Sequence, residues 1–248
     1  MLAEERHALI LDLVNQQGNV KLTELCSRLH ASQSTIRRDL LELSEQGLLT
    51  KVHGGAISRN ERFFPVEHNM EEKANLYIAE KTAIARYAAS LLEEGDFVYL
   101  DAGTTTELMI EYITSRQAVF VTNAISHAKR LAERGFTVYL LGGEFKAVTE
   151  AIVGEEAVAA LEKYNFTKGF WGANGVSLQK GYSTPELKEA MVKRKSMENC
   201  RDCYILADES KFSQISSVTF APFEKATVIT TELKQEIYKD CSNIINIE

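Results

Sequence analysis

The sequence predicts an α/β protein in which a small, mostly helical N-terminal part precedes a larger part built on a parallel sheet. Three observations carry this prediction. Apolar residues recur at helical spacing near the N-terminus, several later strands are apolar without alternation, and helical segments separate those strands. Strands that are apolar on both faces and alternate with helices are typical of a parallel sheet covered by helices on both sides.

Length and charge are consistent with two domains. The chain has 248 residues, 45% of them hydrophobic, which is enough to bury a core without disulfides. Its formal net charge is −7, yet basic and acidic residues are equal in number over residues 1–60, so the remainder carries the whole net charge. A neutral segment on an acidic body fits two domains with different tasks.

The composition also bears on location and on metals. The N-terminal segment contains acidic residues that a signal peptide lacks, and no stretch approaches the ~18 apolar residues of a membrane span. We therefore expect a cytoplasmic protein with no membrane partner. Cys200 and Cys203 form a CxxC pair without a second ligand pair or a nearby histidine, so we interpret them as reduced thiols and expect no metal site.

The first three elements are predicted from apolar periodicity and a capping residue. Apolar residues at helical spacing indicate a first helix that ends before Gly18. A short extended piece follows at 20–22, and Thr23 can cap a second helix whose inward side carries Leu25 and Leu29.

A third helix and a hairpin complete this part. Ser32 can cap the helix, and Gly47 ends it. The stretch LLTKVHGGAI then reads as a hairpin with its turn at Gly54-Gly55. Three helices and a hairpin in residues 1–57 are the layout of a winged helix-turn-helix domain.

Residues 58–75 are polar and lack periodicity, so we interpret them as a linker and assign a second domain to 76–248. In this second domain, helices precede the strands FVYLD, AVFVT, TVYLL, FTKGFWGANG and CYILAD, and the strands ATVITT and NIINI close the chain. This alternation is the α/β pattern of a parallel sheet.

The third helix begins with SQSTIRR and turns acidic from Asp39 onward. In a helix-turn-helix, the N-terminal end of the second helix of the motif enters the major groove. There Gln pairs with adenine and Arg with guanine, while hydroxyls and helix amides hold phosphates. A solvated amphipathic helix is the alternative for any one residue, but the ordered set favours DNA reading. With the hairpin residues that flank the diglycine, the candidate DNA-binding residues are Ser32, Gln33, Ser34, Thr35, Arg37, Arg38, Lys51, His53 and Gly54.

The stretch DAGTTTELM (101–109) follows an apolar strand and predicts an anion site. Its glycine opens a helix at three threonines, and free amides and hydroxyls at a helix start favour an anion. Ligands of open parallel sheets bind at the carboxyl ends of strands, and four other strand ends carry polar or glycine residues. The candidate effector-binding residues are Asp101, Gly103, Thr104, Thr105, Thr106, Thr122, Asn123, Gly142, Gly143, Lys146, Asn174, Glu186, Asp208 and Lys211.

Charged residues among these candidates have distinct expected roles. Lys211 can supply the cation that a phosphate needs, and Lys146 is the second candidate. Asp101 is a poor phosphate ligand because like charges repel, so it is better suited to accept sugar hydroxyls or to orient the loop. Glu186 and Lys188 stand at a helix start, either as ligand contacts or as surface charges and caps.

Two further features have structural interpretations. We interpret the run 193–195 (Lys-Arg-Lys) as a solvated helix face, and Trp171 as part of the core or of a subunit interface.

The stretch HALILDLVNQQGNVKLTELCSRLHASQSTIRRDLLELSEQGLLTKVHGGA resembles the DNA-binding domain of DeoR-type repressors, most specifically in STIRRDL and VHGGA. The resemblance extends through YLDAGTTT, VTNA, LLGG, GANG, YSTPE and ADESKF. It implies a sensor domain similar in fold to ribose-5-phosphate isomerase. Within the family the chain looks most like repressors of fructose-utilisation operons, which implies fructose 1-phosphate as the effector.

Two functions follow from these residues. The first is a repressor: a homo-oligomer, dimer or tetramer, binds paired half-sites of double-stranded operator DNA and is released by a sugar phosphate. The second is an isomerase-like sugar-phosphate enzyme with an N-terminal interaction domain, using carboxylates and a lysine as acid, base and electrostatic stabiliser. Its candidate residues are Asp101, Glu144, Glu186, Asp208 and Lys211. The DNA-reading helix favours the repressor, so we expect no catalytic residue and no cofactor.

Overall fold

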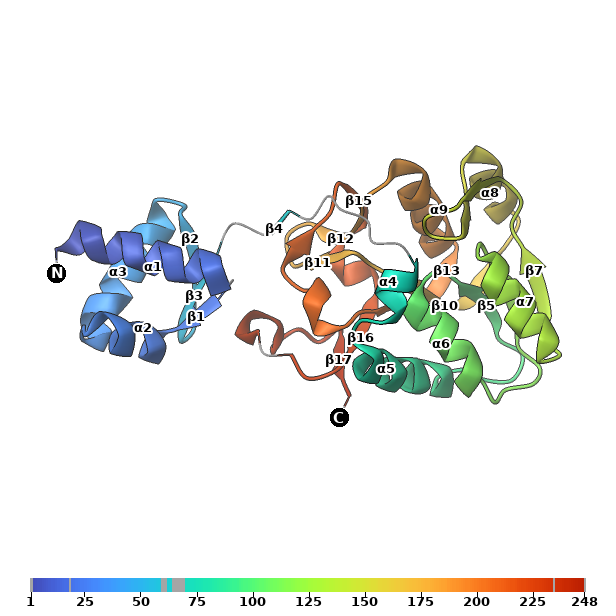
Figure 1. The fold of residues 1–248 in the computed structure, drawn as a ribbon, viewed down its shortest axis with the longest axis horizontal. Helices are drawn as coiled ribbons and strands as arrows, with labels where there is room; N and C mark the ends of the chain where they lie inside the picture. The colour runs from blue at the N-terminus through green and yellow to red at the C-terminus, as the bar shows by residue number, and fades with distance from the viewer. Residues whose placement is uncertain (1, 18, 59–61, 64–69, 234, 248) are drawn as a thin grey trace. The chain divides into compact units, whose positions relative to one another are not determined.

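The computed structural model describes residues 2–17, 19–58, 62–63, 70–233 and 235–247 (Figure 1). It divides into two compact units, Met1–Phe63 with Lys234–Asp240, and Phe64–Leu233 with Cys241–Glu248. Within the described ranges, no helix is long and apolar enough to cross a membrane.

The first unit contains three helices and a small antiparallel sheet. Its elements are α1 (Ala3–Gln17), β1 (Asn19–Lys21), α2 (Leu22–Leu29), α3 (Gln33–Glu45), β2 (Leu49–Val52) and β3 (Gly55–Ser58). The strand order is β1-β3-β2. Apolar residues from all three helices and from the hairpin form one core, in which Ile10, Leu25, Ile36 and Leu49 are fully buried. The periodicity of the sequence therefore predicted this unit correctly.

Three local predictions in this unit have different outcomes. Ser32 caps α3 as expected, because its side chain accepts a hydrogen bond from the Thr35 amide at 3.2 Å. Thr23 does not cap α2, since β1 runs directly into a helix that begins at Leu22. The hairpin turn lies one residue earlier than predicted, with Gly54 in the left-handed region (φ 93°).

Gly55 opens β3 rather than closing the turn. A Cβ at this position would lie 2.3 Å from the Val20 carbonyl oxygen, because β3 pairs with β1 there. The second glycine of the pair is therefore required by the sheet and the first by the turn.

The stretch predicted as a linker, 58–75, has structure of its own. Ser58 ends β3, and the stretch also holds β4 (Arg62–Phe63) and a helix, α4 (Met70–Ala74). Residues 59–61 and 64–69 of the predicted linker lie outside the described residues.

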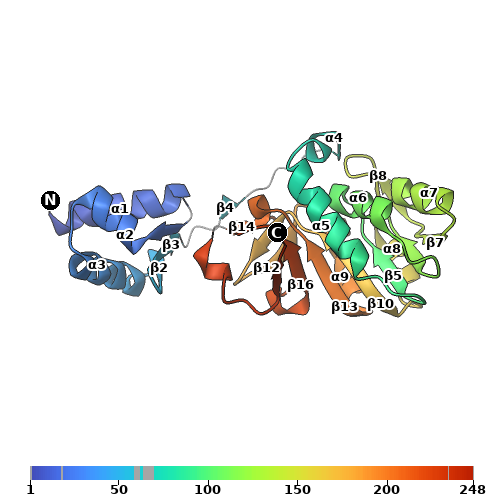
Figure 2. The ribbon, with the colours of Figure 1, turned by 90° about the horizontal axis from the view of Figure 1, so that it is seen from below.

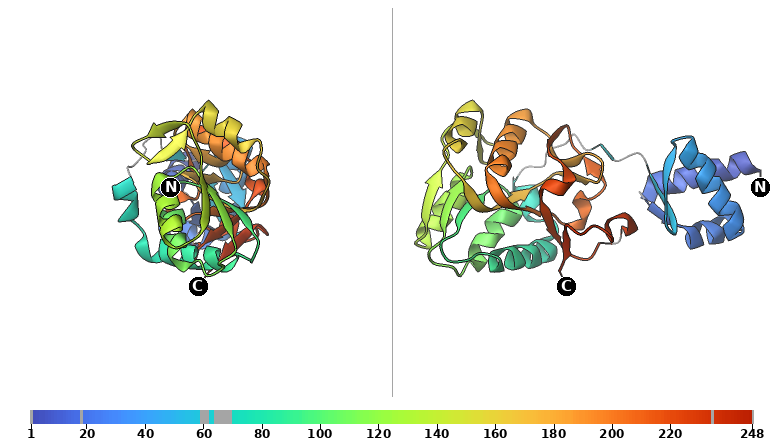
Figure 3. Two further views of the ribbon diagram at one scale, coloured as in Figure 1. Left: turned by 90° about the vertical axis from the view of Figure 1, so that its right-hand side faces the viewer. Right: turned by 180° about the vertical axis from the view of Figure 1, so that it is seen from behind.

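The second unit is built on a sheet of seven described strands in the order β17-β16-β13-β10-β5-β6-β7. Every neighbouring pair is parallel, as predicted from the apolar strands. The strands are β5 (Phe97–Leu100), β6 (Val119–Thr122), β7 (Thr137–Leu140), β10 (Phe166–Gly172), β13 (Cys200–Leu206), β16 (Thr227–Thr230) and β17 (Ile244–Asn246). The helix α5 (Ile78–Ser90) precedes the first of these strands, and α6 (Thr104–Tyr112), α7 (Ile125–Glu133), α8 (Glu155–Leu161) and α9 (Leu187–Glu198) lie between later ones. Figure 3 shows this sheet from its end and from behind.

Side chains alternate between the two covered faces of the sheet. Val98 and Leu100 of β5 pack with apolar residues of α5, α6 and α7 in one core. Figure 2 shows these three helices along one face of the sheet. Tyr99 points the other way and stacks on Trp171 of β10. The Trp171 indole is fully buried and donates to the Ser196 hydroxyl of α9 at 2.9 Å. Trp171 is therefore a core residue that fixes α9 on the second face.

The second unit also contains shorter elements that the sequence did not predict. They are a hairpin of β8 (Glu144–Lys146) and β9 (Ala151–Val153), a three-stranded sheet of β11 (Gly175–Ser177), β12 (Gly181–Thr184) and β15 (Val218–Ala221), the strand β14 (Gln214–Ile215), and the turns η1 (Glu209–Lys211) and η2 (Phe223–Lys225). The turn η3 (Glu236–Tyr238) lies in the segment that groups with the first unit. Strands of this length carry too little periodicity to stand out in a sequence.

The strand order reverses between β5 and β10. From β5 the chain continues to β6 and β7 on one side, and later returns to place β10, β13, β16 and β17 on the other. The crevice outside the carboxyl ends of strands at such a reversal is where open α/β sheets bind ligands. The loop after β5, which begins at Asp101, and the loop after β10 both start at this point.

Candidate functional sites

The candidate DNA-reading surface is the first two turns of α3. Ser32, Gln33, Ser34, Arg37 and Arg38 are exposed there, and Thr35 is half-buried. The Ser32 hydroxyl also lies 2.8 Å from the Ser34 and Thr35 hydroxyl oxygens, so the cap joins the three side chains at the helix start. Exposed amide, hydroxyl and guanidinium groups at a helix N-terminus match the groups that read base edges and hold phosphates.

The back of α3 is fixed by a buried ion pair. Asp39 is only 1% exposed and accepts hydrogen bonds from the Arg6 guanidinium at 2.5 and 2.8 Å. Burial raises the pKa of Asp39, but the hydrogen bonds from Arg6 and His7 outweigh burial and hold it below its usual value. Asp39, the first acidic residue after the reading positions, therefore links α3 to α1 and is not a surface charge.

The hairpin candidates share one hollow with the reading helix. Arg37 lines this hollow together with Lys51, His53 and Gly54, and the latter three are exposed. The first unit thus brings Arg37 of the helix together with the predicted hairpin residues, as a winged DNA-binding domain requires.

A second candidate site lies in the second unit, at the carboxyl ends of β5, β10 and β13. Its lining includes residues from seven separate segments of the chain. They are Lys73, Lys81, Ala102, Gly103, Thr104, Thr105, Thr106, Thr149, Gly172, Ala173, Asn174, Glu189, Lys193, Leu206, Asp208 and Lys211. We refer to this cavity as the lysine pocket.

The loop after β5 forms one wall of the lysine pocket. Thr104 and Thr105 begin the nine-residue helix α6, whose first amides have no partner within the helix. The Thr106 hydroxyl turns back and donates to the carbonyl oxygens of Asp101 (2.7 Å) and Gly103 (2.8 Å), so it closes the loop. Anion contacts are therefore open to the first amides of α6 and to the hydroxyls of Thr104 and Thr105.

Half of the predicted effector residues do not line the lysine pocket; several of them support its wall. Asn123 accepts a hydrogen bond from the Ala102 amide at 2.9 Å and donates to the Ile152 carbonyl at 3.3 Å. Thr122 is fully buried and accepts from the Ala124 amide. Asn123 therefore holds the loop after β5 against the loop after β6, and Thr122 fixes the start of the latter loop.

The glycine pair 142–143 also lies outside the lining. Gly143 has φ 144°, and a Cβ there would lie 2.7 Å from the Val153 carbonyl oxygen. This position is therefore a close approach between the backbones of the β8–β9 hairpin.

Lys146 and Glu186, two further predicted ligands, pair with each other. The Lys146 ammonium lies 2.9 Å from Glu186 and 3.1 Å from Glu189. On the surface beside them, Lys188 pairs with Glu144. These charges hold the β8–β9 hairpin to the start of α9.

The interpretation of 193–195 as a solvated helix face is wrong at Lys193, whose side chain is 3% exposed. Its ammonium pairs with the fully buried Asp101, lies 3.3 Å from Glu189, and donates to the Gly172 carbonyl at 3.2 Å. This ion pair connects Asp101, at the start of the loop after β5, to α9. Burial raises the pKa of Asp101 to about 6, although Lys193 opposes this shift, and the pair is charged at neutral pH.

Glu189 continues this buried network. Burial opposes its ionisation, but Lys193 and Lys146 overcome that cost and lower the pKa of Glu189 to about 2. Its other contact is with the Thr184 hydroxyl, which donates at 3.1 Å. Asp101, Lys193, Glu189 and Lys146 thus alternate in charge from the pocket to the surface hairpin.

Three other lysines converge in the lysine pocket. Lys81 is 5% exposed, and its ammonium donates to the Lys73 carbonyl at the end of α4. Burial lowers the pKa of Lys81; nearby Asp208 opposes the shift, while Lys211 and Lys73 add to it. Asp101 neutralises Lys193, and Lys146 neutralises Glu189, so the other charges of the lining are three lysines against Asp208, an excess of two positive charges. A phosphate monoester carries about −1.5 to −2 charges at pH 7, so the pocket matches it in sign and size.

Sequence reasoning missed Lys73, Lys81, Thr149, Glu189 and Lys193 in this pocket. A signal existed for Lys81, which stands three, four and seven residues before Ile84, Ala85 and Ala88 on one buried helix face. Glu189 and Lys193 similarly share the buried face of α9. Nothing local distinguishes Lys73 or Thr149 from surface residues.

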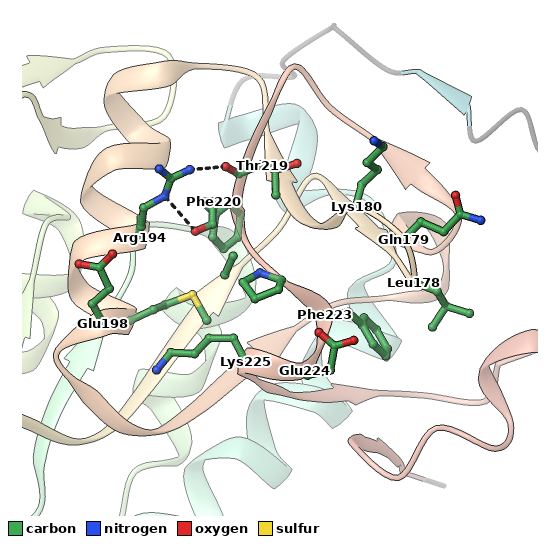
Figure 4. A pocket seen from close by; sticks show the side chains of 13 residues that line it. Leu178, Gln179, Lys180, Arg194, Glu198, Thr219, Phe220, Phe223, Glu224 and Lys225 are labelled. Atoms are coloured by element: carbon green, nitrogen blue, oxygen red, sulfur yellow. Dashed lines mark hydrogen bonds between the residues drawn. The ribbon is translucent and has the colours of Figure 1, made fainter.

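A second cavity of about 460 Å³ lies between α9 and the β15–η2 segment (Figure 4). Its buried floor is apolar, formed in part by Met197, Phe220 and Phe223. Arg194 on its rim donates to the carbonyl oxygens of Thr219 and Phe220, as the dashed lines in Figure 4 show. Cations and carboxylates are mixed around this rim, so the lysine pocket is the better anion site.

Comparison with known proteins adds two family models. The model described as the DeoR C terminal sensor domain matches residues 77–233. The model described as the DeoR-like helix-turn-helix domain matches residues 6–62.

Curated relatives match along nearly the whole chain. A Bacillus subtilis (strain 168) protein described as "Uncharacterized HTH-type transcriptional regulator FruR" is 44% identical over 236 residues, covering 95% of this chain and 93% of the relative. The "Lactose phosphotransferase system repressor" of Staphylococcus aureus (strain N315) is 38% identical over 239 residues, covering 95% of this chain and 94% of the relative.

Solved structures match more distantly. Ribose 5 phosphate isomerase A from Neisseria gonorrhoeae aligns with a TM-score of 0.40 and 18% identity, covering 61% of this chain and 57% of that one. The eIF2B delta subunit of Chaetomium thermophilum aligns with a TM-score of 0.47 and 15% identity, covering 65% and 58%. Likeness at this level supports no inference about activity.

Proposed function

This chain belongs to the DeoR family of transcriptional regulators, and from that premise we propose that it is a DNA-binding repressor of a sugar-utilisation operon, released from its operator by a sugar phosphate. Fructose 1-phosphate is the proposed effector and the cytoplasm the proposed location. The observation that carries the proposal is the lysine pocket, whose excess of two positive charges faces the start of α6.

The DNA-binding half of the proposal rests on the first unit. Residues 1–57 form the proposed DNA-binding domain, 58–75 join it to the rest, and 76–248 sense the ligand. Arg37 and Gln33 read base edges, while Ser32, Lys51 and His53 hold phosphates. A dimer or tetramer places two such domains on paired half-sites, because helix-turn-helix proteins match symmetric operators with their own symmetry.

The ligand-binding half assigns the phosphate to Thr104, Thr105 and Lys211. Asn174, across the pocket after β10, is the proposed contact for sugar hydroxyls. The relatives support a sugar-linked role. One is described as a lactose phosphotransferase system repressor, and another carries the name FruR. The ligand releases DNA by binding one arrangement of the oligomer more tightly than the other.

We propose that the protein is not an enzyme. Of the carboxylates considered for catalysis, Asp101 pairs with Lys193, Glu186 with Lys146 and Glu144 with Lys188. None of these three carboxylates lines the lysine pocket, and each is already held by a lysine, so none is placed to take a proton from a ligand there. Purified protein should therefore leave hexose and pentose phosphates unchanged.

Isothermal titration of the full chain tests the proposal. Fructose 1-phosphate should bind, whereas unphosphorylated fructose should not, and fructose 6-phosphate should bind more weakly. Lys211→Ala should weaken the binding at least tenfold because it removes a charge-assisted contact, while Lys129→Ala, on an exposed face of α7, should leave it unchanged. Equal binding of fructose and its 1-phosphate would contradict the proposal.

A further inference from the structure

The turn of the β8–β9 hairpin contains one buried residue, and that residue is polar. Across 142–150, every residue is exposed or half-buried except Thr149, which is 6% exposed. Val148, its apolar neighbour, is 47% exposed. The hydrophobic effect alone would bury the valine and leave the threonine in water. The burial of Thr149 therefore needs a reason other than apolar packing.

The Thr149 hydroxyl is also unsatisfied. It has no hydrogen-bond partner within the part of the chain that the structure describes. A buried hydroxyl without a partner destabilises a fold, and such groups are rare in native proteins. Thr149 lines the lysine pocket, and among the described residues of that lining it carries the one buried side-chain group that lacks a partner. The pocket is thus where a partner for this hydroxyl can enter.

The backbone holds Thr149 in this position. Glu150, the next residue, has φ 51°, a left-handed conformation that is uncommon for residues other than glycine. On either side of the turn, Lys146 pairs with Glu189 of α9 at 3.1 Å, and the Ile152 amide donates to the loop after β6. An uncommon backbone conformation that the surrounding structure fixes is typical of segments that contact ligands.

The chemistry of the lining indicates which part of a ligand meets Thr149. Thr149 is the only residue that the β8–β9 hairpin contributes to the described lining, and it is neutral. The lysines of the lining and the first amides of α6 come from other elements, and they match the oxygens of a phosphate dianion, which only accept hydrogen bonds. A threonine hydroxyl both donates and accepts, as the hydroxyls of a sugar do. Thr149 therefore complements the sugar part of the ligand.

We propose that Thr149 is a specificity-determining contact that forms a hydrogen bond with a hydroxyl of the bound sugar. This inference rests on the proposed function, because it takes the ligand to be a phosphorylated sugar. A ligand without a hydroxyl at the matching position leaves the buried Thr149 hydroxyl unpaired and binds more weakly. The lysine pocket then selects for phosphate through its cations and for the sugar through the turn of the β8–β9 hairpin.

Isothermal titration of the full chain with fructose 1-phosphate tests this contact. Thr149→Val keeps the shape of the side chain but removes the hydroxyl, and it should weaken binding about tenfold. Thr149→Ser keeps the hydroxyl and should bind within about threefold of the wild-type protein. The matched control is Thr230→Val, at the end of β16. The Thr230 hydroxyl is also buried and without a partner among the described residues, but it lies outside the pocket lining, so this variant should bind as the wild-type protein does.

Two measurements of thermal unfolding distinguish this contact from a structural role and from a phosphate contact. The melting temperature of Thr149→Val without ligand should equal or exceed that of the wild-type protein, because the substitution removes an unsatisfied polar group. Inorganic phosphate, which has no sugar hydroxyl, should shift the melting temperature of the two proteins equally.

The possible results separate the contact from the ligand site. If the wild-type protein and Thr149→Val bind fructose 1-phosphate equally well, the contact is overturned and the ligand site stands. A lower melting temperature of Thr149→Val would assign the hydroxyl to the fold, and a smaller shift with phosphate in that variant would assign it to the phosphate. Either result contradicts contact with the sugar. If the wild-type protein does not bind fructose 1-phosphate, the proposed effector and this contact both fail.

Discussion

The two candidate sites are built in opposite ways. The DNA-reading surface uses exposed side chains from one helix and one hairpin, all within residues 32–54. The lysine pocket uses buried charges from segments that span 73–211, among them Lys81 (5% exposed) and Lys193 (2% exposed). Surface residues can be changed without disturbing the fold, whereas buried ion pairs cannot. The two proposed activities should therefore separate cleanly by mutation, with different costs in stability.

Loss of Lys193 should have the largest effect. Lys193→Ala leaves the buried Asp101 without its cation and Glu189 with Lys146 alone, and breaking a buried pair in this way typically costs about 3–5 kcal/mol. Urea unfolding followed by the fluorescence of Trp171 measures this, because the single tryptophan of the chain lies in the sheet unit. Lys188→Ala, at a solvent-exposed pair, is the control and should change stability little. Equal effects of the two changes would show that the buried network does not stabilise the unit.

Loss of Arg37 should affect DNA alone. Arg37→Ala removes an exposed guanidinium from the reading helix and should weaken operator binding by up to about 3 kcal/mol, or roughly 100-fold. Fluorescence anisotropy on a DNA fragment selected by the protein from a random pool measures the change. Arg28→Ala on α2, another exposed arginine, should have little effect. Unchanged affinity in Arg37→Ala would exclude α3 as the reading helix.

Acid should weaken the sheet unit through His127. This side chain is fully buried, and burial lowers its pKa to about 3, with the Gly103 carbonyl opposing the shift. Below its ordinary pKa of 6.5 the unfolded chain takes up a proton that the folded chain refuses, so stability is present above pH 6.5 and is lost as pH falls. The contribution should be about 2 kcal/mol between pH 6.5 and pH 5.

Comparison with His127→Gln separates the contribution of His127 from those of the other titratable groups. Urea unfolding at pH 7 and pH 5 should show a smaller loss of stability in the variant than in the wild-type protein. Parallel pH curves for the two proteins would refute the assignment.

Loss of the Thr105 hydroxyl should have the smallest effect. Thr105→Val keeps the shape of the side chain and should weaken the response to fructose 1-phosphate about tenfold, equal to about 1.4 kcal/mol, with operator affinity unchanged. The dose of ligand needed for half release of DNA is the readout. A dose curve that does not move would place the phosphate elsewhere.

The same contrast explains what the sequence could predict. The reading surface could be predicted because a cap at Ser32, a helix and a short hairpin are local sequence patterns, and the side chains between them face outward. The parallel sheet and the loop after β5 were accessible because apolar strands and helix starts are also local. The buried ion pair of Asp39 could not be predicted because its partner, Arg6, lies 33 residues away in the sequence.

The lysine pocket was only partly accessible because its electrostatics depend on long-range pairs. Lys193 stands in a run of three cations that resembles a solvated face, and its burial follows from contact with Asp101, 92 residues away. Lys146 and Glu186 looked like ligands, but they neutralise each other. The tertiary fold, and not the spacing of residues in the sequence, decides which lysine pairs with a carboxylate and which lines the cavity.

The central claim is that a phosphorylated sugar in the lysine pocket controls DNA binding by the winged domain. The most direct test is fluorescence anisotropy of the full chain on its selected operator, with increasing fructose 1-phosphate or fructose. Fructose 1-phosphate should release the wild-type protein, fructose should not, and Thr105→Val should need about tenfold more ligand. Release that is equal for both sugars, or absent for both, would contradict the account.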